Sequence, residues 1–167
     1  MLVALFFMEV LLEINSKDYK GEEINKIRRA TRAVLIDEND KIALLNVSKL
    51  GIYKLPGGGI DEGEEIEESL KRECYEETGC EIKDIKEIGV VVENRNSLKQ
   101  INYCFICNVK SKGKPEFTQK ELDLGFKVEW VSINEAVDKI RSGNKKISGA
   151  SNSILRESFI VEKAIEN

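Results

Sequence analysis

The sequence contains no histidine among its 167 residues. Imidazole is therefore excluded as a general base, a nucleophile or a metal ligand, and acid–base work falls to carboxylates, lysine, tyrosine, cysteine or metal-bound water. Cysteine is also scarce, and the four cysteines are too unevenly placed for a disulfide-stapled scaffold, which indicates reduced thiols and a cytoplasmic protein. Cys104 and Cys107 form C-x-x-C, but a strand would send them to opposite faces of its sheet.

Long apolar runs are lacking too. Residues Met1–Leu12 are apolar, but Glu9 interrupts them well short of a membrane span, and they lack the basic start and cleavage pattern of a signal peptide. We expect no membrane partner. The stretch predicts either a buried first strand or, for residues 1–7, an extension ahead of a start at Met8.

An excess of positive charge is absent as well. Twenty-six basic against thirty acidic residues give a formal charge of -4, which disfavours long nucleic acid as a partner. A small phosphorylated substrate stays compatible with this charge, because a bound divalent cation reverses the local field of an acidic pocket.

The length and the hydrophobic content of 41% fit one domain over residues 1–167. β-rich runs alternate with helical patterns, which favours an α/β (α+β) fold with a mixed sheet between helices. Ser132 and Glu135 have the spacing of a capping box. We predict strands at 30–36, 42–47, 82–92, 100–109 and 126–131, and helices at 64–78, from 133 to about 140, and within 153–165.

Two polar segments interrupt this pattern. Pro56 stops regular pairing and the following Gly57-Gly58-Gly59 permits positive φ, so a sharply shaped loop is expected there. The segment Ser142–Ser153 is rich in serine, glycine and asparagine, and it predicts a flexible connector or a loop on the substrate side.

The helix that follows the glycine loop carries a stripe of acids. Glu73, Glu76 and Glu77 are related by i+3 and i+4 and share one sector of the helix. Their oxygen ligands suit Mg²⁺, with Mn²⁺ as an alternative, better than zinc. Because glutamate-rich helices are common, a solvated helix face explains the same spacing.

The surrounding residues resemble the signature of the Nudix hydrolases, GX5EX7REUXEEXGU, over residues 58–80. Gly58, Glu64, Arg72-Glu73, Glu76-Glu77 and Gly79 match at the required spacing. Cysteine stands at both bulky aliphatic positions, 74 and 80, where it still behaves as a small buried hydrophobe. The order of elements agrees with the family from about residue 29 to residue 165.

This resemblance implies an α/β/α sandwich with a mixed, curved sheet and a metal-holding loop and helix. The Gly58 carbonyl with Glu73, Glu76 and Glu77 would bind Mg²⁺, while Glu64 and Arg72 would hold the loop and helix in register. For the general base, Glu73 is the first candidate, and Glu121 resembles a loop acid that some relatives use in that role.

For function, the resemblance implies hydrolysis of a phosphoanhydride bond in a nucleoside diphosphate derivative, a small-molecule nucleotide substrate. Residues 91–102 have neither the proline of ADP-ribose enzymes nor the tyrosine of dinucleoside polyphosphate enzymes, which favours a MutT-like nucleoside triphosphate pyrophosphatase. The alternatives are a noncatalytic nucleotide-sensing module and a hydrolase of nucleotide sugars or dinucleotides. Trp130, Tyr53 and Tyr103 are candidates for base contacts, and both a monomer and a homodimer stay open.

Overall fold

The computed structural model describes residues 8–166 of the chain. Its strands are β1 (Val10–Asn15), β2 (Lys26–Ile36), β3 (Ile42–Val47), β4 (Ile52–Lys54), β5 (Glu81–Arg95), β6 (Leu98–Ser111) and β7 (Phe126–Val131). Its helices are α1 (Ile66–Thr78), α2 (Gln119–Asp123), α3 (Ile133–Arg141) and α4 (Ala150–Glu166). The strands form one mixed sheet in the order β1-β5-β6-β2-β3-β4, with β7 paired to β3.

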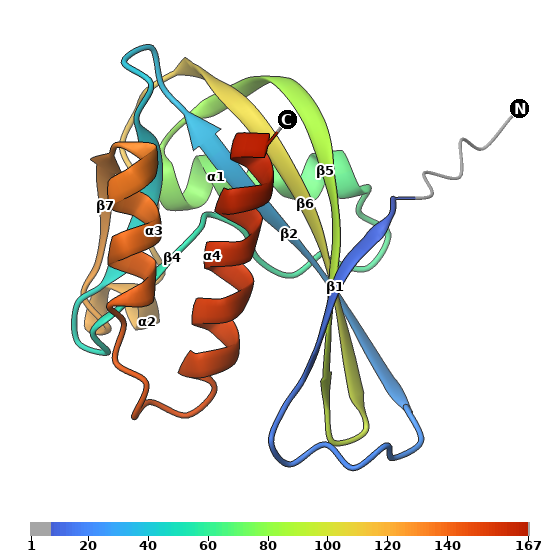
Figure 1. Cartoon of the computed structure of the whole chain (residues 1–167). Coiled ribbons are helices and arrows are strands. Elements are labelled where there is room, and N and C mark those ends of the chain that lie inside the picture. Colours follow the sequence, from blue (N-terminus) through green and yellow to red (C-terminus); the bar gives the residue numbers. More distant parts are fainter. Residues whose placement is uncertain (1–7, 167) are drawn as a thin grey trace, which may run out of the picture.

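Helices cover both faces of the sheet, and α3 and α4 lie on the face opposite α1 (Figure 1). Strand alternation divides the apolar residues between two cores. On β2, Val34 belongs to the core under α4, whereas Leu35 belongs to the core under α1. On β6, Cys104 and Cys107 fall into these two different cores, as their spacing predicts. The expected α/β/α sandwich is confirmed.

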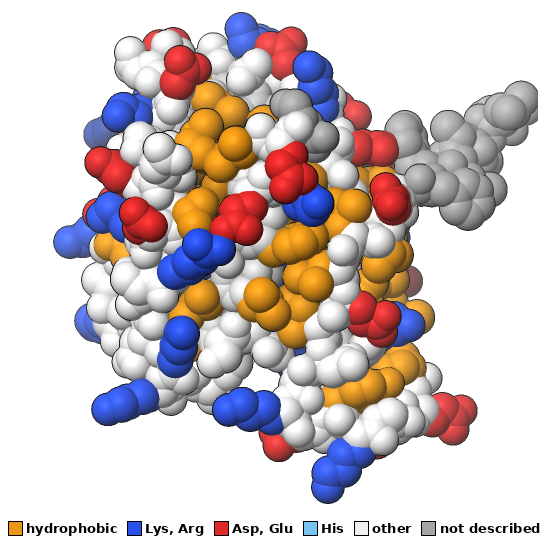
Figure 2. Space-filling model, in the orientation of Figure 1, with side chains coloured by type: hydrophobic (Ala, Val, Ile, Leu, Met, Phe, Trp, Pro, Cys, Tyr) orange, Lys and Arg blue, Asp and Glu red, His pale blue; other side chains and the backbone are white. Residues whose placement is uncertain are grey.

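The long β5–β6 hairpin extends beyond the helices as an arm (Figure 1). β1 and the first half of β2 extend with it, because each pairs in parallel with one strand of the hairpin along its length. The space-filling view shows a hollow between this arm and the body of the molecule, with basic side chains on both sides (Figure 2). The arm therefore adds a second wall beside the body.

The predicted elements agree closely with those observed. The strand at 42–47 and the strand at 126–131 have the predicted bounds, and the other three predicted strands are longer at one or both ends. The Ser132 capping box is present. β4 and α2 were not predicted, and α4 begins at Ala150, so the connector after α3 is shorter than expected.

The prediction of a buried first strand within Met1–Leu12 is only partly correct. β1 begins at Val10 and lies at the edge of the sheet, where only Ile14 is buried. Residues 1–7, the expected extension, lie outside the described residues. No helix between residues 8 and 166 has the length and apolarity that a membrane crossing requires.

The glycine loop lies along β2 like an extra strand. Thr31 N–H donates to the Gly58 carbonyl at 2.9 Å, and Ala33 N–H donates to the Pro56 carbonyl at 2.9 Å. Gly57, between these contacts, has φ +147°, and a Cβ there would lie 2.0 Å from the Thr31 carbonyl oxygen. The close approach of two backbones therefore requires glycine at this position.

We predict that Gly57→Ala lowers the free energy of unfolding by about 3 kcal/mol, because the added methyl group meets backbone that cannot move aside. Gly63→Ala is the matched control. Gly63 also has a positive φ, +77°, but nothing lies within 4 Å of a Cβ there. Its cost should be limited to about 1 kcal/mol of backbone strain. Urea denaturation measures both values, and equal values would contradict the clash.

Candidate active site

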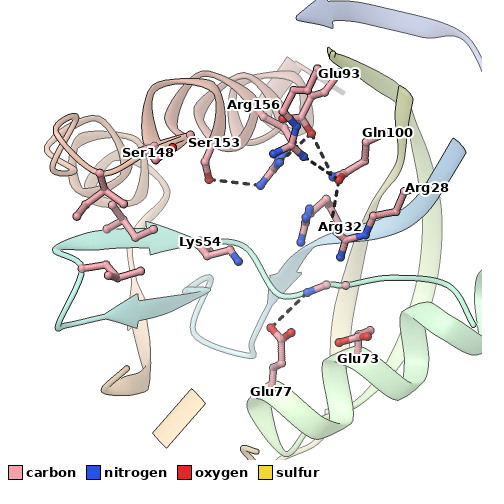
Figure 3. Close-up of a pocket in the computed structure, with 18 of the residues that line it drawn as sticks. Arg28, Arg32, Lys54, Glu73, Glu77, Glu93, Gln100, Ser148, Ser153 and Arg156 are labelled. Atoms are coloured by element: carbon pink, nitrogen blue, oxygen red, sulfur yellow. Dashed lines mark hydrogen bonds and ion pairs between the residues drawn. The ribbon is translucent and has the colours of Figure 1, made fainter. Parts of the chain in front are cut away.

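A cavity of about 450 Å³ opens between the glycine loop, α1, the arm and the start of α4. It is lined mainly by charged and polar residues, and the close-up shows acids of α1 on one side and bases of β2, β4 and α4 on the other (Figure 3). The charged lining residues are Arg28, Arg32, Lys54, Glu73, Glu77, Glu93, Arg95, Glu121 and Arg156.

Glu73 and Glu77 form the acidic side of the cavity. Glu77 is 7% exposed, and its Oε2 accepts a hydrogen bond from Gly57 N–H at 3.4 Å. Burial and the neighbouring charge of Glu73 raise the pKa of Glu77 to about 9. Glu73 packs against Gly58, where a Cβ would lie 2.5 Å from its carboxylate. Two predicted ligands and the predicted glycine therefore meet at one place.

Glu76 shares a hydrogen-bond donor with Glu73, because Arg72 Nη1 donates to both carboxylates. The side chain of Glu76 is 43% exposed, it is outside the cavity lining, and Arg72 Nη1 donates to its Oε2 at 3.3 Å. Partial burial raises the pKa of Glu76. Glu121, the predicted loop acid, is the N3 residue of the short helix α2 and lines the cavity. Its charge acts on Glu76, so the acid from the separate loop lies close to the carboxylate helix.

Arg72 connects the loop to the helix. Its guanidinium donates to both carboxylate oxygens of Glu64, at 2.7 and 3.0 Å, and to the Gly59 carbonyl at 3.0 Å. It also donates to Glu73 at 2.9 Å. These hydrogen bonds lower the pKa of Glu64 to about 2. The bidentate partner of Arg72 is thus Glu64, and single hydrogen bonds join Arg72 to Glu73 and Glu76 as well.

The acidic side has the chemistry of a divalent-cation site. Burial raises the pKa of Glu77 most and the charge of Glu73 raises it further, and a cation between the two carboxylates would offset their repulsion. Their hard oxygen ligands suit Mg²⁺ or Mn²⁺. Within residues 8–166 no three acidic or thiol side chains already converge on one point, and Arg72 holds both Glu73 and Glu76. The Glu73–Glu77 pair is therefore the part of the set that fits a cation.

The basic side of the cavity was not predicted from the sequence. Arg156 is buried between Glu93, at 2.8 Å, and Glu157, at 2.6 Å. Arg32 is 4% exposed, and burial lowers its pKa. Burial also lowers the pKa of Lys54, which points into the cavity (Figure 3). The available signal was the i, i+4 spacing of Arg28 and Arg32, which places both on one face of a strand.

The aromatic residues considered as base contacts do not line the cavity. Trp130 lies under Lys112, whose Nζ is 4.1 Å from the ring centroid, and Tyr103 lies under Arg29. Tyr53 lies under Lys139 on the other side of β4. The apolar part of the cavity lining, called the apolar ledge below, consists instead of Leu50, Ile52, Ile147 and Ala150. Part of the predicted segment Ser142–Ser153 thus lies at the cavity, as a substrate-side loop would.

Comparison with known proteins identifies relatives of this chain. The chain is 30% identical over 115 residues to "Nudix hydrolase 7" of Arabidopsis thaliana. The matched region covers 64% of this chain and 40% of that protein. It is 28% identical over 123 residues to "Diphosphoinositol polyphosphate phosphohydrolase 3-alpha" of Mus musculus, which covers 73% of each chain. A MutT protein of Bacillus halodurans has a similar structure, with a TM-score of 0.59, 22% identity and coverage of 84% of this chain and 83% of that chain.

The fold and the loop–helix site together define the class of Nudix hydrolases, which act on pyrophosphate bonds. The profile of the NUDIX domain matches residues 26–149, which is most of the chain. The chain therefore belongs to the NUDIX domain family.

The contact between Glu64 and Arg72 makes stability depend on pH. The folded state lowers the pKa of Glu64 from 4.5 to about 2, so its stabilising effect is complete above the unfolded pKa and is lost as the pH falls through the folded pKa. We predict that Glu64→Gln lowers the free energy of unfolding by about 2 kcal/mol at neutral pH.

The difference between Glu64→Gln and the wild type should shrink as the pH falls from about 5 toward 2. Urea denaturation at several pH values measures it. Glu67→Gln is the control, because Glu67 is 62% exposed and pairs only with Lys71 in a surface ion pair. Its effect should stay below about 0.5 kcal/mol at every pH. A pH-independent cost of Glu64→Gln would contradict the ion-pair account.

Proposed function

We propose that the chain hydrolyses a phosphoanhydride bond in a nucleoside triphosphate in a magnesium-dependent reaction, as a MutT-like pyrophosphatase. The observation that carries this proposal is the convergence of Glu73 and Glu77 beside the glycine loop, across one cavity from buried cations. A diphosphate with a divalent cation has charges that complement both sides of such a cavity.

Glu73 and Glu77, together with the Gly58 carbonyl, would hold the cation, and Glu76 would join them by rotating away from Arg72. Arg72 keeps its bidentate contact with Glu64 if Glu76 leaves, so the loop and helix stay connected. The Gly58 carbonyl accepts one hydrogen bond, from Thr31, and keeps a second lone pair. A divalent cation here supplies charge neutralisation of the phosphate oxygens and lowers the pKa of a bound water.

The remaining work belongs to side chains of the chain itself. Lys54 and Arg32 would neutralise phosphate oxygens, because they are the two cations that act most on buried Glu77. Glu121 suits the role of general base. Its Oε1 accepts from Thr118 N–H, which orients the carboxylate at the cavity edge, while Glu73 is engaged with Arg72. Glu73 remains the alternative base.

Two features of the cavity bear on the substrate. The apolar ledge beside the start of α4 provides a surface for a nucleoside, without an aromatic stacking partner. The five basic lining residues also favour a second candidate, a diphosphate carried on a polyphosphorylated ring, as the name of the Mus musculus relative describes. A nucleotide-sensing module without catalytic activity is the third candidate function. An assay of hydrolysis distinguishes it from the first two candidates.

We predict that the protein with Mg²⁺ releases phosphate or pyrophosphate from at least one member of a panel of nucleoside triphosphates, nucleotide sugars, dinucleotides and diphosphoinositol polyphosphates. Release should stop in EDTA and return with excess Mg²⁺. Mn²⁺ tests the alternative metal in the same assay. Binding of a panel member without any turnover would support the sensing module and contradict the proposed enzyme.

We predict that Glu77→Gln and Glu76→Gln each lower turnover by at least ~100-fold, in keeping with loss of metal-assisted catalysis. Glu68→Gln is the matched control, because Glu68 lies on the same helix, is exposed and takes part only in the capping box. Its turnover should stay within about twofold of the wild type. Circular dichroism checks that the three variants are folded. Wild-type turnover in both site variants would refute the assignment.

A further inference from the structure

Two arginines from different strands meet at one neutral oxygen on the arm side of the cavity. Arg28 of β2 donates through Nη1 to Gln100 Oε1 at 3.3 Å, and Arg95 of β5 donates through Nη2 to the same oxygen at 3.1 Å. Gln100 belongs to β6, which lies between those two strands. All three residues line the cavity, and Figure 3 shows Arg28 and Gln100 close together at its edge.

The orientation of Gln100 is set from behind. Gln100 is 1% exposed, and its Nε2 donates to Glu93 Oε2 at 3.2 Å and to Asn102 Oδ1 at 2.9 Å. The strand register brings these side chains together, because Gln100 of β6 is paired with Arg28 of β2 on one side and with Glu93 of β5 on the other. The amide nitrogen is therefore held by buried acceptors, and the amide oxygen is left to face both arginines.

The described residues balance the positive charge of this pair only in part. Among residues 8–166, neither Arg28 nor Arg95 has a carboxylate within ion-pair distance. The charge of Arg95 acts on Glu93, but Glu93 is itself paired with Arg156 at 2.8 Å. Arg95 Nε is buried without a hydrogen-bond partner. Two guanidinium groups held beside one neutral oxygen repel each other, and an anion between them would offset that repulsion.

A third arginine, Arg32, also indicates that the cavity binds an anion. Arg32 lies on the cavity side of β2 and is 4% exposed, yet its Nε has no hydrogen-bond partner and lies 3.9 Å from the nearest Glu157 oxygen. Arg28 and Arg32 share a strand face, and their backbones are about 13 Å apart at 3.3 Å per residue. Cations therefore continue along the cavity from the surroundings of Glu77 to the arm.

We propose that Arg28 and Arg95, oriented by Gln100, form a clamp for a phosphate group additional to the two joined by the bond that is cleaved. The clamp rests on the proposed function for the position of that bond, near Glu73 and Glu77. Paired guanidinium groups suit phosphate, because each planar fork can donate two hydrogen bonds to a tetrahedral oxyanion. The additional phosphate is either the last group of a linear triphosphate or a ring phosphate of an inositol polyphosphate.

Binding of anions tests the clamp separately from turnover. Calorimetry with saturating Mg²⁺, so that a cation near Glu73 and Glu77 can hold the first two phosphates, would compare pyrophosphate, inorganic tripolyphosphate and inositol hexakisphosphate with the wild type and with Arg28→Gln and Arg95→Gln. Each variant should weaken binding of tripolyphosphate, of inositol hexakisphosphate or of both by about tenfold, the effect of one lost hydrogen-bonded charge contact. Pyrophosphate binding should change by less than about threefold, because two phosphates leave the clamp unfilled.

Arg29→Gln is the matched control. It removes the same charge from the next residue of β2, but Arg29 lies on the other face of the strand against Tyr103. Its anion binding should stay near that of the wild type. Thermal unfolding checks that all variants are folded, as expected from the exposed position of Arg28 and the half-buried position of Arg95.

The outcomes separate the two sources and decide the proposal. A loss confined to tripolyphosphate identifies a linear chain, and a loss confined to inositol hexakisphosphate identifies ring phosphates. The proposal is overturned if pyrophosphate binding falls equally, if Arg29→Gln weakens binding as much, or if the wild type binds none of the three anions. Absence of hydrolysis in the panel assay would refute the enzyme and leave this binding result unaffected.

Discussion

The contact of Arg72 with Glu64 is the interaction on which the site depends. One guanidinium joins the end of the glycine loop to the first acid of the carboxylate row, through Glu64, Gly59 and Glu73. Because both carboxylate oxygens of Glu64 are engaged, the loop cannot shift along α1 without breaking two charged hydrogen bonds. The positions of Gly58 beside Glu73 and of Gly57 beside Glu77 follow from this restraint.

The cavity concentrates charge that a stable protein core would exclude. Glu77, Arg32, Glu93, Arg156 and Glu157 are all nearly buried, and several have pKa values moved by burial. Burying a charge is costly unless it is paired, and only part of this cluster is paired within the chain. A metal ion with an anionic substrate would complete the pairing on both sides. The cluster is therefore better explained by ligand binding than by stability.

The distribution of charge also narrows the search for a substrate. No aromatic side chain between residues 8 and 166 lines the cavity, so recognition would rest on phosphate groups and on the apolar residues near α4. Five basic residues from β2, β4, β5 and α4 face two acids of α1, Glu73 and Glu77, across this space. The arm contributes Arg28 and Arg95 to the cavity lining, so the length of the β5–β6 hairpin would decide whether the proposed clamp exists.

Local sequence determined the strands, the main helices and the loop–helix signature, because each depends on periodicity, capping or glycine within a few residues. The acidic residues Glu73, Glu76 and Glu77 could be predicted from such local patterns, and so could the supporting residues Glu64 and Arg72. Only the tertiary structure decided that Glu64 is the bidentate partner of Arg72, that Glu76 lies outside the cavity lining, and that Glu121 reaches the cavity. The basic side could not be predicted, because Arg28, Arg95 and Arg156 are far apart in sequence and meet only through sheet register and the packing of α4. Helix and strand patterns are local, whereas the pairing of charges across a cavity depends on long-range packing.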